Sequence, residues 1–306
     1  MMKSEELSLK LDRGALSGNI ATISEHRSCW KLLTNTSSPM LRAIACKVLP
    51  ASVRRALRGW LTRNRDTELV TSVSNGYEVI VGEIHPALLR GWQTPAVAER
   101  QHATFAPLLR RMNEGKPRED FVALATAVQM TGLKDPLIIE VGCGSGWNSE
   151  VLTHLLERPI RYIGLDYSPA MIALGKRCYP DVQFGVGDAT ALPCKGCVCD
   201  ILLSGTVLMH LLDYRQAVQE SRRVARRWCI FHTVPVFEHR QTTFLRKRAY
   251  GQPVIEVIFN EEELCQLLRR SGLLVRHVLD SIPYNLEAIL GEPTVTRTYV
   301  CEVTER

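Results

Sequence analysis

The sequence contains no apolar run that approaches the roughly 20 residues needed to span a bilayer. Its N-terminus, MMKSEELSLKLDRG, also lacks the apolar core of a secretory signal. We therefore expect a cytoplasmic protein whose ten cysteines stay reduced. Apolar residues make up 45% of the 306 residues and charged residues 23%, which is ordinary for a globular chain of one large domain with an appendage or of two small ones.

The cysteines also lack the arrangement of a typical zinc site. Cys194 and Cys197 have the C-x-x-C spacing that can bind zinc, but no second pair and no nearby H-x-x-x-H accompanies them. Cys199 begins the apolar run CDILLSG, in which cysteine behaves as a small hydrophobic residue. We expect no bound metal, and zinc or redox chemistry at this cluster is the less favoured alternative.

Acidic residues are absent from Met40–Arg65, although this segment carries seven Arg and Lys. The whole chain has a net charge of +6, so its basic character is concentrated here. Apolar residues recur at helical spacing on both sides of Pro50 and are flanked by basic residues, a pattern typical of helices on anionic membrane surfaces. We expect a helical N-terminal extension in peripheral contact with an anionic membrane. The alternative is that its apolar stripe packs on the rest of the protein.

The segments before position 94 differ in pattern from the rest of the chain. Residues 1–39 are polar and weakly periodic, which predicts a mobile tail. Residues 40–93 combine the basic segment with alternating apolar residues around Asn75-Gly76, a pair that favours a hairpin turn. Residues 94–306 are expected to form one domain, which starts with a helical pattern and has its core from 136 onward.

Short apolar strands and amphipathic helices alternate in that core. The apolar runs LIIEV, RYIGLD, VQFGVGD, CDILLSG and WCIFHTV are mostly separated by helical patterns, which is typical of a parallel sheet with helices on both faces. An irregular stretch is expected from Pro235 to Phe259, followed by a helix and two strands. We therefore expect an α/β fold: a Rossmann-like doubly wound sheet of about seven strands, mostly parallel, with one antiparallel strand near the C-terminus.

Three glycines follow the first of these strands, at Gly142, Gly144 and Gly146, and Glu140 precedes them. In such sheets ligands bind beyond the carboxyl ends of the strands, where glycine lets the backbone approach a ligand closely. A dinucleotide pyrophosphate requires G-x-G-x-x-G, but Trp147 stands in place of the third glycine. A carboxylate at the strand end would also repel a pyrophosphate, whereas it suits a cationic ligand.

This turn resembles the first motif of the class I S-adenosylmethionine-dependent methyltransferases, and the resemblance continues along the chain. YIGLDYSPAMIALGK is similar to the second-strand motif of that family, VQFGVGDATALP to the third, and CDILLSGTVLMHLLDY to the fourth strand with its exit loop. The match covers roughly residues 94–306. It departs from the family at LPCKGCVCD, where an aromatic pair is often found, and this departure does not touch the cofactor positions.

The resemblance implies S-adenosylmethionine as the cofactor. Glu140 would face the methionine amino group, Asp166 would accept both ribose hydroxyls, and Tyr167 would pack beside the adenine. Asp188 would lie near the adenine amino group, and Ala189 would supply a backbone contact. The complete set of cofactor-binding residues that the resemblance implies is Glu140, Gly142, Gly144, Gly146, Asp166, Tyr167, Asp188, Ala189 and Ser204.

Two histidines are candidates for a general base, which is needed only if the acceptor must lose a proton. His210 follows the fourth strand, and His232 ends the fifth, where strand ends point toward a substrate. Each has a structural alternative: His210 can shape the adenosine pocket, and His232 can bond within the sheet. An anionic or hydroxyl-rich acceptor has further candidate ligands, unless they form a solvated basic loop: Arg246, Lys247, Arg248 and Tyr250.

The resemblance therefore implies transfer of a methyl group to a small-molecule or glycan-like acceptor. The broad group in question acts on small molecules, quinones and sugars, and the sequence carries no acceptor signature of the N-P-P-Y type. Two alternatives stay open. The chain can be a cofactor-binding protein without catalysis, or a nucleic-acid methyltransferase, which the basic segment alone favours.

Overall fold

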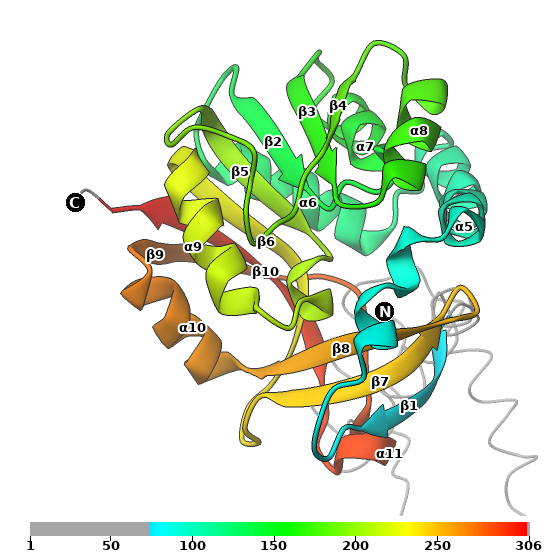
Figure 1. The fold of residues 1–306 in the computed structure, drawn as a ribbon. Coiled ribbons are helices and arrows are strands. Elements are labelled where there is room, and N and C mark those ends of the chain that lie inside the picture. The colour runs from blue at the N-terminus through cyan, green and yellow to red at the C-terminus, as the bar shows by residue number, and fades with distance from the viewer. Residues whose placement is uncertain (1–73, 305–306) are drawn as a thin grey trace, which may run out of the picture. The chain divides into compact units, whose positions relative to one another are not determined.

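The computed structural model of the protein describes residues 74–304. The mobile tail expected for residues 1–39 and the basic helix expected for Met40–Arg65 lie outside these residues and stay predictions. Helices in the described part pack on a central sheet, as Figure 1 shows.

The described sheet has ten strands in the order β1-β7-β8-β6-β5-β2-β3-β4, with β10 beside β6 and β9 beside β10. Its parallel strands are β2 (Leu137–Val141), β3 (Arg161–Asp166), β4 (Gln183–Val186), β5 (Cys199–Gly205) and β6 (Ala225–Phe237). The helices between them are α7 (Trp147–Leu155), α8 (Pro169–Cys178) and α9 (Tyr214–Val224). The predicted Rossmann-like arrangement is confirmed.

Two further strands lie on the other side of β6. β10 (Val295–Val303) runs antiparallel to both β6 and β9 (Leu273–Asp280), which confirms the antiparallel strand expected near the C-terminus. α10 (Glu261–Arg270) precedes them, and the side chain of Asn260 caps it by accepting the N–H of Glu263 at 3.0 Å. Three glutamates in its first turn and two arginines in its last turn suit the helix dipole.

The helical segment before β2 also agrees with the sequence pattern. Its elements are the short helices η2 (Pro86–Leu89) and η3 (Gly91–Gln93), followed by α5 (Pro95–Asn113) and α6 (Glu119–Met130). One more short helix, α11 (Glu287–Leu290), lies between β9 and β10. Within residues 74–304, no helix is both long and apolar enough to cross a membrane.

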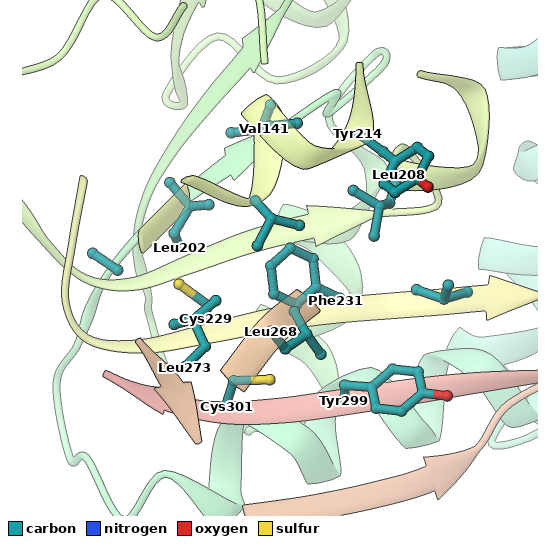
Figure 2. Close-up of a cluster of buried hydrophobic side chains, with 14 of the residues drawn as sticks. Val141, Leu202, Leu208, Tyr214, Cys229, Phe231, Leu268, Leu273, Tyr299 and Cys301 are labelled. Atoms are coloured by element: carbon teal, nitrogen blue, oxygen red, sulfur yellow. The ribbon is translucent and has the colours of Figure 1, made fainter. Parts of the chain in front are cut away.

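Apolar side chains cover both faces of the sheet, because neighbouring residues of a strand point to opposite sides. Leu202 and Phe231 belong to the core that α9 and α10 cover, which Figure 2 shows in close-up. Leu203 and Ile230, one position along the same strands, belong to the core that α5, α6 and α7 cover. Burial on both faces explains why these strands are continuously apolar in the sequence.

A β-hairpin occupies the stretch that was expected to be irregular. β7 (Thr243–Ala249) and β8 (Gln252–Asn260) pair antiparallel, with Tyr250 and Gly251 at the turn. These two residues have φ of 51° and 81°, and positive φ at both central positions is typical of the type I′ hairpin turn. The expectation of irregular structure was wrong because the inward-facing positions include a lysine and a glutamate, which interrupt the apolar alternation typical of a strand.

The pair Asn75-Gly76 lies inside β1 (Ser74–Val79) and not in a hairpin turn, so that prediction was wrong. β1 pairs antiparallel with β7, and the register shifts between Asn75 and Glu78. Gly76 has a φ of 67°, which a β-bulge accommodates. Together β1, β7 and β8 extend the sheet, which is why it has ten strands and not about seven.

Candidate functional site

A cavity of about 360 Å³ lies at the carboxyl ends of the parallel strands. One wall comes from the turns after β2 to β5, and the opposite wall comes from β1, β7 and β8, which lie below the parallel strands in Figure 1. Most residues that the sequence suggested for the site line this cavity: Gly142, Gly144, Asp166, Tyr167, Asp188, Ala189, His210 and His232. Glu140, Gly146 and Ser204 lie behind the lining.

The glycine turn after β2 brings the backbone close to the cavity. Gly142 has a φ of 67°, and a Cβ atom added there would lie 1.9 Å from Cγ2 of Val207. Gly144 has a φ of 56°, and its Cβ would lie 2.6 Å from the ring of Trp147 and 3.1 Å from Oε1 of Gln101. Positive φ and lack of space together require glycine at both positions.

Two buried polar atoms in the cavity lining have no hydrogen-bond partner among the described residues. They are Oε1 of Gln101, an acceptor beside the glycine turn, and Nε1 of Trp92, a donor. Unpartnered buried polar atoms are rare in native proteins, and each calls for an explanation. Both atoms are covered by neighbouring protein atoms, so a ligand in the cavity would reach them only after a side-chain rotation. Sequence reasoning missed both residues because neither belongs to a recognisable motif.

Glu140 is fully buried at the end of β2. Its Oε1 accepts a hydrogen bond from Nδ2 of Asn148 at 2.7 Å, and its Oε2 accepts one from the hydroxyl of Tyr162. Burial raises the pKa of Glu140 to about 7, although both hydrogen bonds act in the opposite direction. Asn148 lines the cavity in front of Glu140, and sequence reasoning missed it.

Asp166 ends β3, and its side chain lines the cavity with only 6% exposed. Its carboxylate accepts the backbone N–H of Gly144 at 2.9 Å and of Ser168 at 2.8 Å. Burial raises its pKa to about 6, against the effect of these two bonds. Each carboxylate oxygen can accept more than one hydrogen bond, so Asp166 keeps capacity for a ligand hydroxyl.

The residues suggested for an adenine ring lie together after β3 and β4. Tyr167 lines the cavity, and its hydroxyl donates to the carbonyl of Leu89 at 3.4 Å. Asp188 is exposed to the cavity, and its Oδ1 accepts both the N–H and the hydroxyl of Thr190 at 2.8 Å. Its other oxygen is therefore available to a ligand, and Ala189 lies next to it in the lining.

His210 belongs to the short helix η4 (Leu208–His210) after β5. Its Nδ1 lies 2.9 Å from the carbonyl oxygen of Ile255. A carbonyl can only accept, so Nδ1 carries the proton and Nε2 keeps a free lone pair. Burial, with a smaller effect of the Lys247 charge, lowers the pKa of His210 to about 3, so the ring is neutral at pH 7. The ring of Trp92 packs against it, with centroids 4.7 Å apart.

His232 lies within a network of hydroxyl groups in β6 and β10. Its Nδ1 is 2.8 Å from the hydroxyl of Thr298, and its Nε2 is 3.1 Å from the hydroxyl of Thr233. Burial lowers the pKa of His232 to about 4. Thr233 has a φ of 56° and Thr206, after β5, has a φ of 58°, which is unusual for β-branched residues. Strained backbone of this kind often clusters at functional sites.

The opposite wall of the cavity contains a buried ion pair. Nζ of Lys247 in β7 lies 2.5 Å from Oε2 of Glu256 in β8, and their side chains are 6% and 0% exposed. The hydroxyl of Tyr284 donates to Oε1 of Glu256 at 2.7 Å, and the hydroxyl of Tyr77 lies 3.1 Å from that of Tyr284. The sequence suggested Lys247 as a ligand but gave no sign of its partners, which lie far apart along the chain.

A second charged pair lines the cavity at the start of α6. Arg118 donates two hydrogen bonds to Asp120, from Nε at 2.6 Å and from Nη2 at 2.5 Å. The guanidinium carbon also lies 5.3 Å and 5.2 Å from the ring centroids of Phe105 and Phe121. This arrangement occupies the planar face and two donors of Arg118. Sequence reasoning missed the pair because Pro117 and the acids after it also suit an ordinary helix start.

The other residues suggested as ligands of the acceptor do not all line the cavity. Tyr250 lines the cavity, whereas Arg246 and Arg248 are exposed and outside the lining, and Arg246 pairs with Glu78. Among residues 74–304 there is no group of three or more His, Cys, Asp or Glu side chains that could hold a metal ion. Cys199 is buried, and its thiol donates to the carbonyl of Val224.

Comparison with known proteins identifies the fold around this cavity. Residues 139–231, which include the glycine turn, Asp166 and His210, match the family model described as "Methyltransferase domain". This part of the chain is a class I S-adenosylmethionine-dependent methyltransferase domain. The cofactor of the family is S-adenosylmethionine, as the resemblance in the sequence implied.

Two curated relatives share part of this methyltransferase domain. A Mycolicibacterium smegmatis protein named "Probable S-adenosylmethionine-dependent methyltransferase" is 31% identical over 143 residues, which are 46% of this chain and 53% of the relative. A demethylmenaquinone methyltransferase of Renibacterium salmoninarum is 32% identical over 89 residues, which are 29% of this chain and 36% of the relative. The chain thus spans about half the length of the first and about a third of the second.

One solved structure that is similar to this chain is a Burkholderia thailandensis 1,6-didemethyltoxoflavin-N1-methyltransferase with bound 1,6-didemethyltoxoflavin and S-adenosylhomocysteine. It is 16% identical to this chain, with a TM-score of 0.48, and the match covers 75% of this chain and 95% of that one.

Proposed function

We propose that the chain transfers a methyl group from S-adenosylmethionine to a small-molecule acceptor bound in the same cavity. The observation that carries the proposal is that the glycine turn, Asp166 and Asp188 line one wall of a cavity whose opposite wall has its own polar groups. A protein that only stored the cofactor would not need that second wall. The family match of residues 139–231 supports the same reaction.

The hydrogen-bond acceptors of the first wall suit this cofactor. Asp166 and the free oxygen of Asp188 are acceptors for the ribose hydroxyls and the adenine amino group. Oε1 of Gln101, beside Gly144, has no partner, and after a rotation of its side chain it would be an acceptor for the amino group of the methionine part. Because Glu140 lies behind Asn148, we propose that it acts on the cofactor through Asn148 and through its charge. When bound, the cofactor supplies a methyl group already activated on a sulfonium, which leaves positioning as the main task of the protein.

Of the two candidate histidines, His210 is the better hydrogen-bond acceptor for a ligand. Its Nδ1–H is directed to the Ile255 carbonyl, so the lone pair of Nε2 is available. Both nitrogens of His232 have hydroxyl partners, which favours a role in holding the strained backbone at Thr233. We therefore propose that Nε2 of His210 accepts a hydrogen bond from the acceptor hydroxyl and orients it, and that His232 is a positioning residue. A pKa of about 3 makes His210 too weak a base to hold the proton at pH 7.

The proposed acceptor is a small molecule with an aromatic or otherwise apolar body. The cavity is lined by Trp92, Tyr77, Tyr250 and Tyr284, and a relative is named as a demethylmenaquinone methyltransferase. A quinone-like acceptor agrees with both facts. A glycan-like acceptor, which the sequence left open, has less support because several aromatic rings line the cavity and suit a planar apolar body better than a sugar.

Cofactor binding is testable by calorimetry with S-adenosylmethionine and S-adenosylhomocysteine, with NAD as a negative ligand. Asp166→Ala should weaken binding by roughly 1.5–3 kcal/mol, about 10- to 100-fold, because it removes a charged acceptor for hydroxyl groups. Asp135→Ala, at an exposed aspartate outside the cavity, is the matched control and should leave the affinity unchanged. Equal affinity of the wild type and Asp166→Ala would refute the role of this carboxylate.

We also propose that the basic segment Met40–Arg65 docks the protein on anionic membrane surfaces, where a lipid-soluble acceptor would be found. Each basic residue near such a surface contributes about 1 kcal/mol before screening. Co-sedimentation with vesicles of graded anionic content, at low and high salt, tests this. Equal binding to neutral and anionic vesicles, or none, would assign the segment to packing, and salt-sensitive binding to RNA would favour the nucleic-acid alternative.

A further inference from the structure

The buried lysine of the second wall defines the chemistry of the acceptor, on the basis of the proposed function. We propose that Lys247 binds the ionised hydroxyl of the acceptor, so that the acceptor belongs to the class of acidic hydroxyl compounds: phenols, enols and hydroquinones. Nε2 of His210 accepts a hydrogen bond from the un-ionised hydroxyl, and the proton leaves to solvent when the hydroxyl ionises. Lys247 is thus the residue that selects this class of substrate.

The alternation of β7 directs Lys247 inward. Leu245, Lys247 and Ala249 are buried, whereas Arg246 and Arg248 between them are exposed. Burying an ammonium group costs several kcal/mol unless a counter-charge accompanies it. A lysine is therefore not expected at an inward position of this strand for packing alone, since leucine or methionine would fill the same space without that cost.

The partners of Lys247 leave its N–H groups available. Glu256 supplies the counter-charge, with Oε2 only 2.5 Å from Nζ, yet that oxygen receives no aligned hydrogen bond. The contact is thus a pairing of charges more than a directed hydrogen bond. An ammonium has three donors, and those of Lys247 that are not directed at Glu256 can reach a ligand in the cavity that its side chain lines.

The pair Tyr77–Tyr284 fixes the carboxylate of Glu256. Because Glu256 can only accept, Tyr284 donates to it, and Tyr77 in turn donates to the oxygen of Tyr284. Glu256 is therefore held from two sides and cannot turn toward a ligand. The Lys247 ammonium also lies 5.4 Å from the ring centroid of Tyr77, which holds the cation against an aromatic face.

Other charged groups of the cavity do not compete for an anion. Of the described residues that line it, Arg118 and Lys247 are the cationic ones, and Arg118 already donates two hydrogen bonds to Asp120. Asp166 and Asp188 lie on the wall formed by the turns after β2 to β5, which we call the cofactor wall, and they repel anions. Lys247 is therefore the cation with donors available.

A single oxyanion suits this site better than a carboxylate or phosphate. Those groups are usually bound by the fork of an arginine or by several cations. Here one ammonium faces the ligand while a carboxylate stands directly behind it, which disfavours a dianion. A hydroxyl on a planar conjugated body presents one oxygen of partial negative charge, and the aromatic side chains around the cavity suit that body.

The geometry of β8 also brings His210 to the same location. Ile255, whose carbonyl holds His210, is the neighbour of Glu256 in β8. The charge of Lys247 is close enough to contribute to the lowered pKa of His210, after the larger effect of burial. A hydroxyl bound between them can donate a hydrogen bond to Nε2; when it ionises, its proton leaves to solvent while its oxygen keeps the electron pair and gains the Lys247 charge as partner.

The test uses 4-nitrophenol, whose absorbance reports its ionisation, with S-adenosylhomocysteine at saturation. Bound to the full-length wild type, the probe should ionise at a lower pH than in solution, by about one pH unit, because an ammonium favours the anion. At a pH where the probe is ionised, it should also bind at least tenfold more tightly than its methyl ether, 4-nitroanisole.

The variants isolate Lys247. Lys247→Met alone leaves Glu256 buried without a counter-charge and is expected to fold poorly. The double variant Lys247→Met/Glu256→Gln removes both charges, and it should lose the shift and the preference over 4-nitroanisole. Arg246→Met, which changes the exposed neighbour on the same strand, should keep both.

Three outcomes would overturn the inference: no binding of 4-nitrophenol to the wild type, no preference over 4-nitroanisole, or an unchanged shift in the double variant. Calorimetry with S-adenosylhomocysteine on the same samples separates the two levels. If that ligand binds to all variants while the phenol test fails, only the inference about the acceptor falls. If it does not bind to the wild type, the proposed function falls as well.

Discussion

Each wall of the cavity contains one fully buried glutamate, and the two are held in different ways. On the cofactor wall, Glu140 has only neutral donors, Asn148 and Tyr162, and burial raises its pKa to about 7. On the opposite wall, which β1, β7 and β8 form and which we call the acceptor wall, Glu256 lies against the ammonium of Lys247. A cation that arrives with a ligand would therefore favour ionisation of Glu140, whereas Glu256 is already paired with the cation of Lys247.

The two walls also differ in how the chain builds them. The cofactor wall is made of short turns after successive strands, in which backbone N–H groups and glycines carry much of the geometry. The acceptor wall is made of side chains from β1, β7, β8 and the connection before β10, which are far apart in sequence. The first wall therefore depends on backbone conformation and the second on a network of buried charges and hydroxyl groups.

The largest expected effect on stability is at Glu256. Glu256→Gln leaves the Lys247 ammonium buried without a counter-charge, which should lower the free energy of unfolding by about 3–5 kcal/mol. Urea denaturation followed by circular dichroism measures this. A loss below about 1 kcal/mol would mean that solvent already stabilises Lys247. It would contradict an ion pair that is shielded from water.

Gly142 and Gly76 offer a matched pair, because both have a φ of 67°. Gly142→Ala meets Val207 at 1.9 Å and should lower the free energy of unfolding by about 2–4 kcal/mol, from overpacking and backbone strain together. Gly76→Ala has open space around it, so it should show the strain alone, about 1–2 kcal/mol. Equal losses in thermal denaturation would contradict the crowding at the cofactor wall.

Glu140→Gln should change how stability depends on pH. The pKa of Glu140 is raised from 4.5 to about 7 in the folded protein, so the folded state binds more protons than the unfolded state between these values. Stability from this group is present below pH 4.5 and is lost as the pH rises to 7. The variant lacks that loss, so at pH 8 it should gain roughly 3 kcal/mol relative to the wild type.

Comparison of the two proteins at pH 4.5 supplies the internal control, since the advantage of Glu140→Gln should vanish there. An advantage that does not depend on pH would mean that burial does not penalise the ionised form of Glu140.

The smallest expected change concerns the two histidines. Their pKa values are lowered by burial to about 3 for His210 and about 4 for His232, so both rings should stay neutral from pH 8 to pH 5. Imidazole proton signals in NMR, assigned with His210→Gln and His232→Gln, should therefore not shift over that range. A midpoint near the ordinary 6.5 for either ring would show that water reaches it.

The sequence predicted the cofactor wall far better than the acceptor wall. The strands RYIGLD and CDILLSG agree residue for residue with β3 and β5, because buried parallel strands are continuous apolar runs with clear ends. The hairpin β7–β8 escaped prediction because Lys247 and Glu256 occupy inward positions and look like solvated charges. Their pairing follows from the hairpin itself, whereas the contact of Tyr77 with Tyr284 joins segments that are far apart in the sequence, which no local pattern reveals.

The most direct test of the central claim is transfer of a labelled methyl group. The purified full-length protein is incubated with methyl-labelled S-adenosylmethionine and a cell extract, which is then separated into small molecules, lipids, nucleic acids and proteins. The account predicts label in small molecules or lipids with an equal amount of S-adenosylhomocysteine, and a strongly reduced amount with Asp166→Ala. Absence of S-adenosylhomocysteine formation, or label confined to nucleic acid, would contradict it.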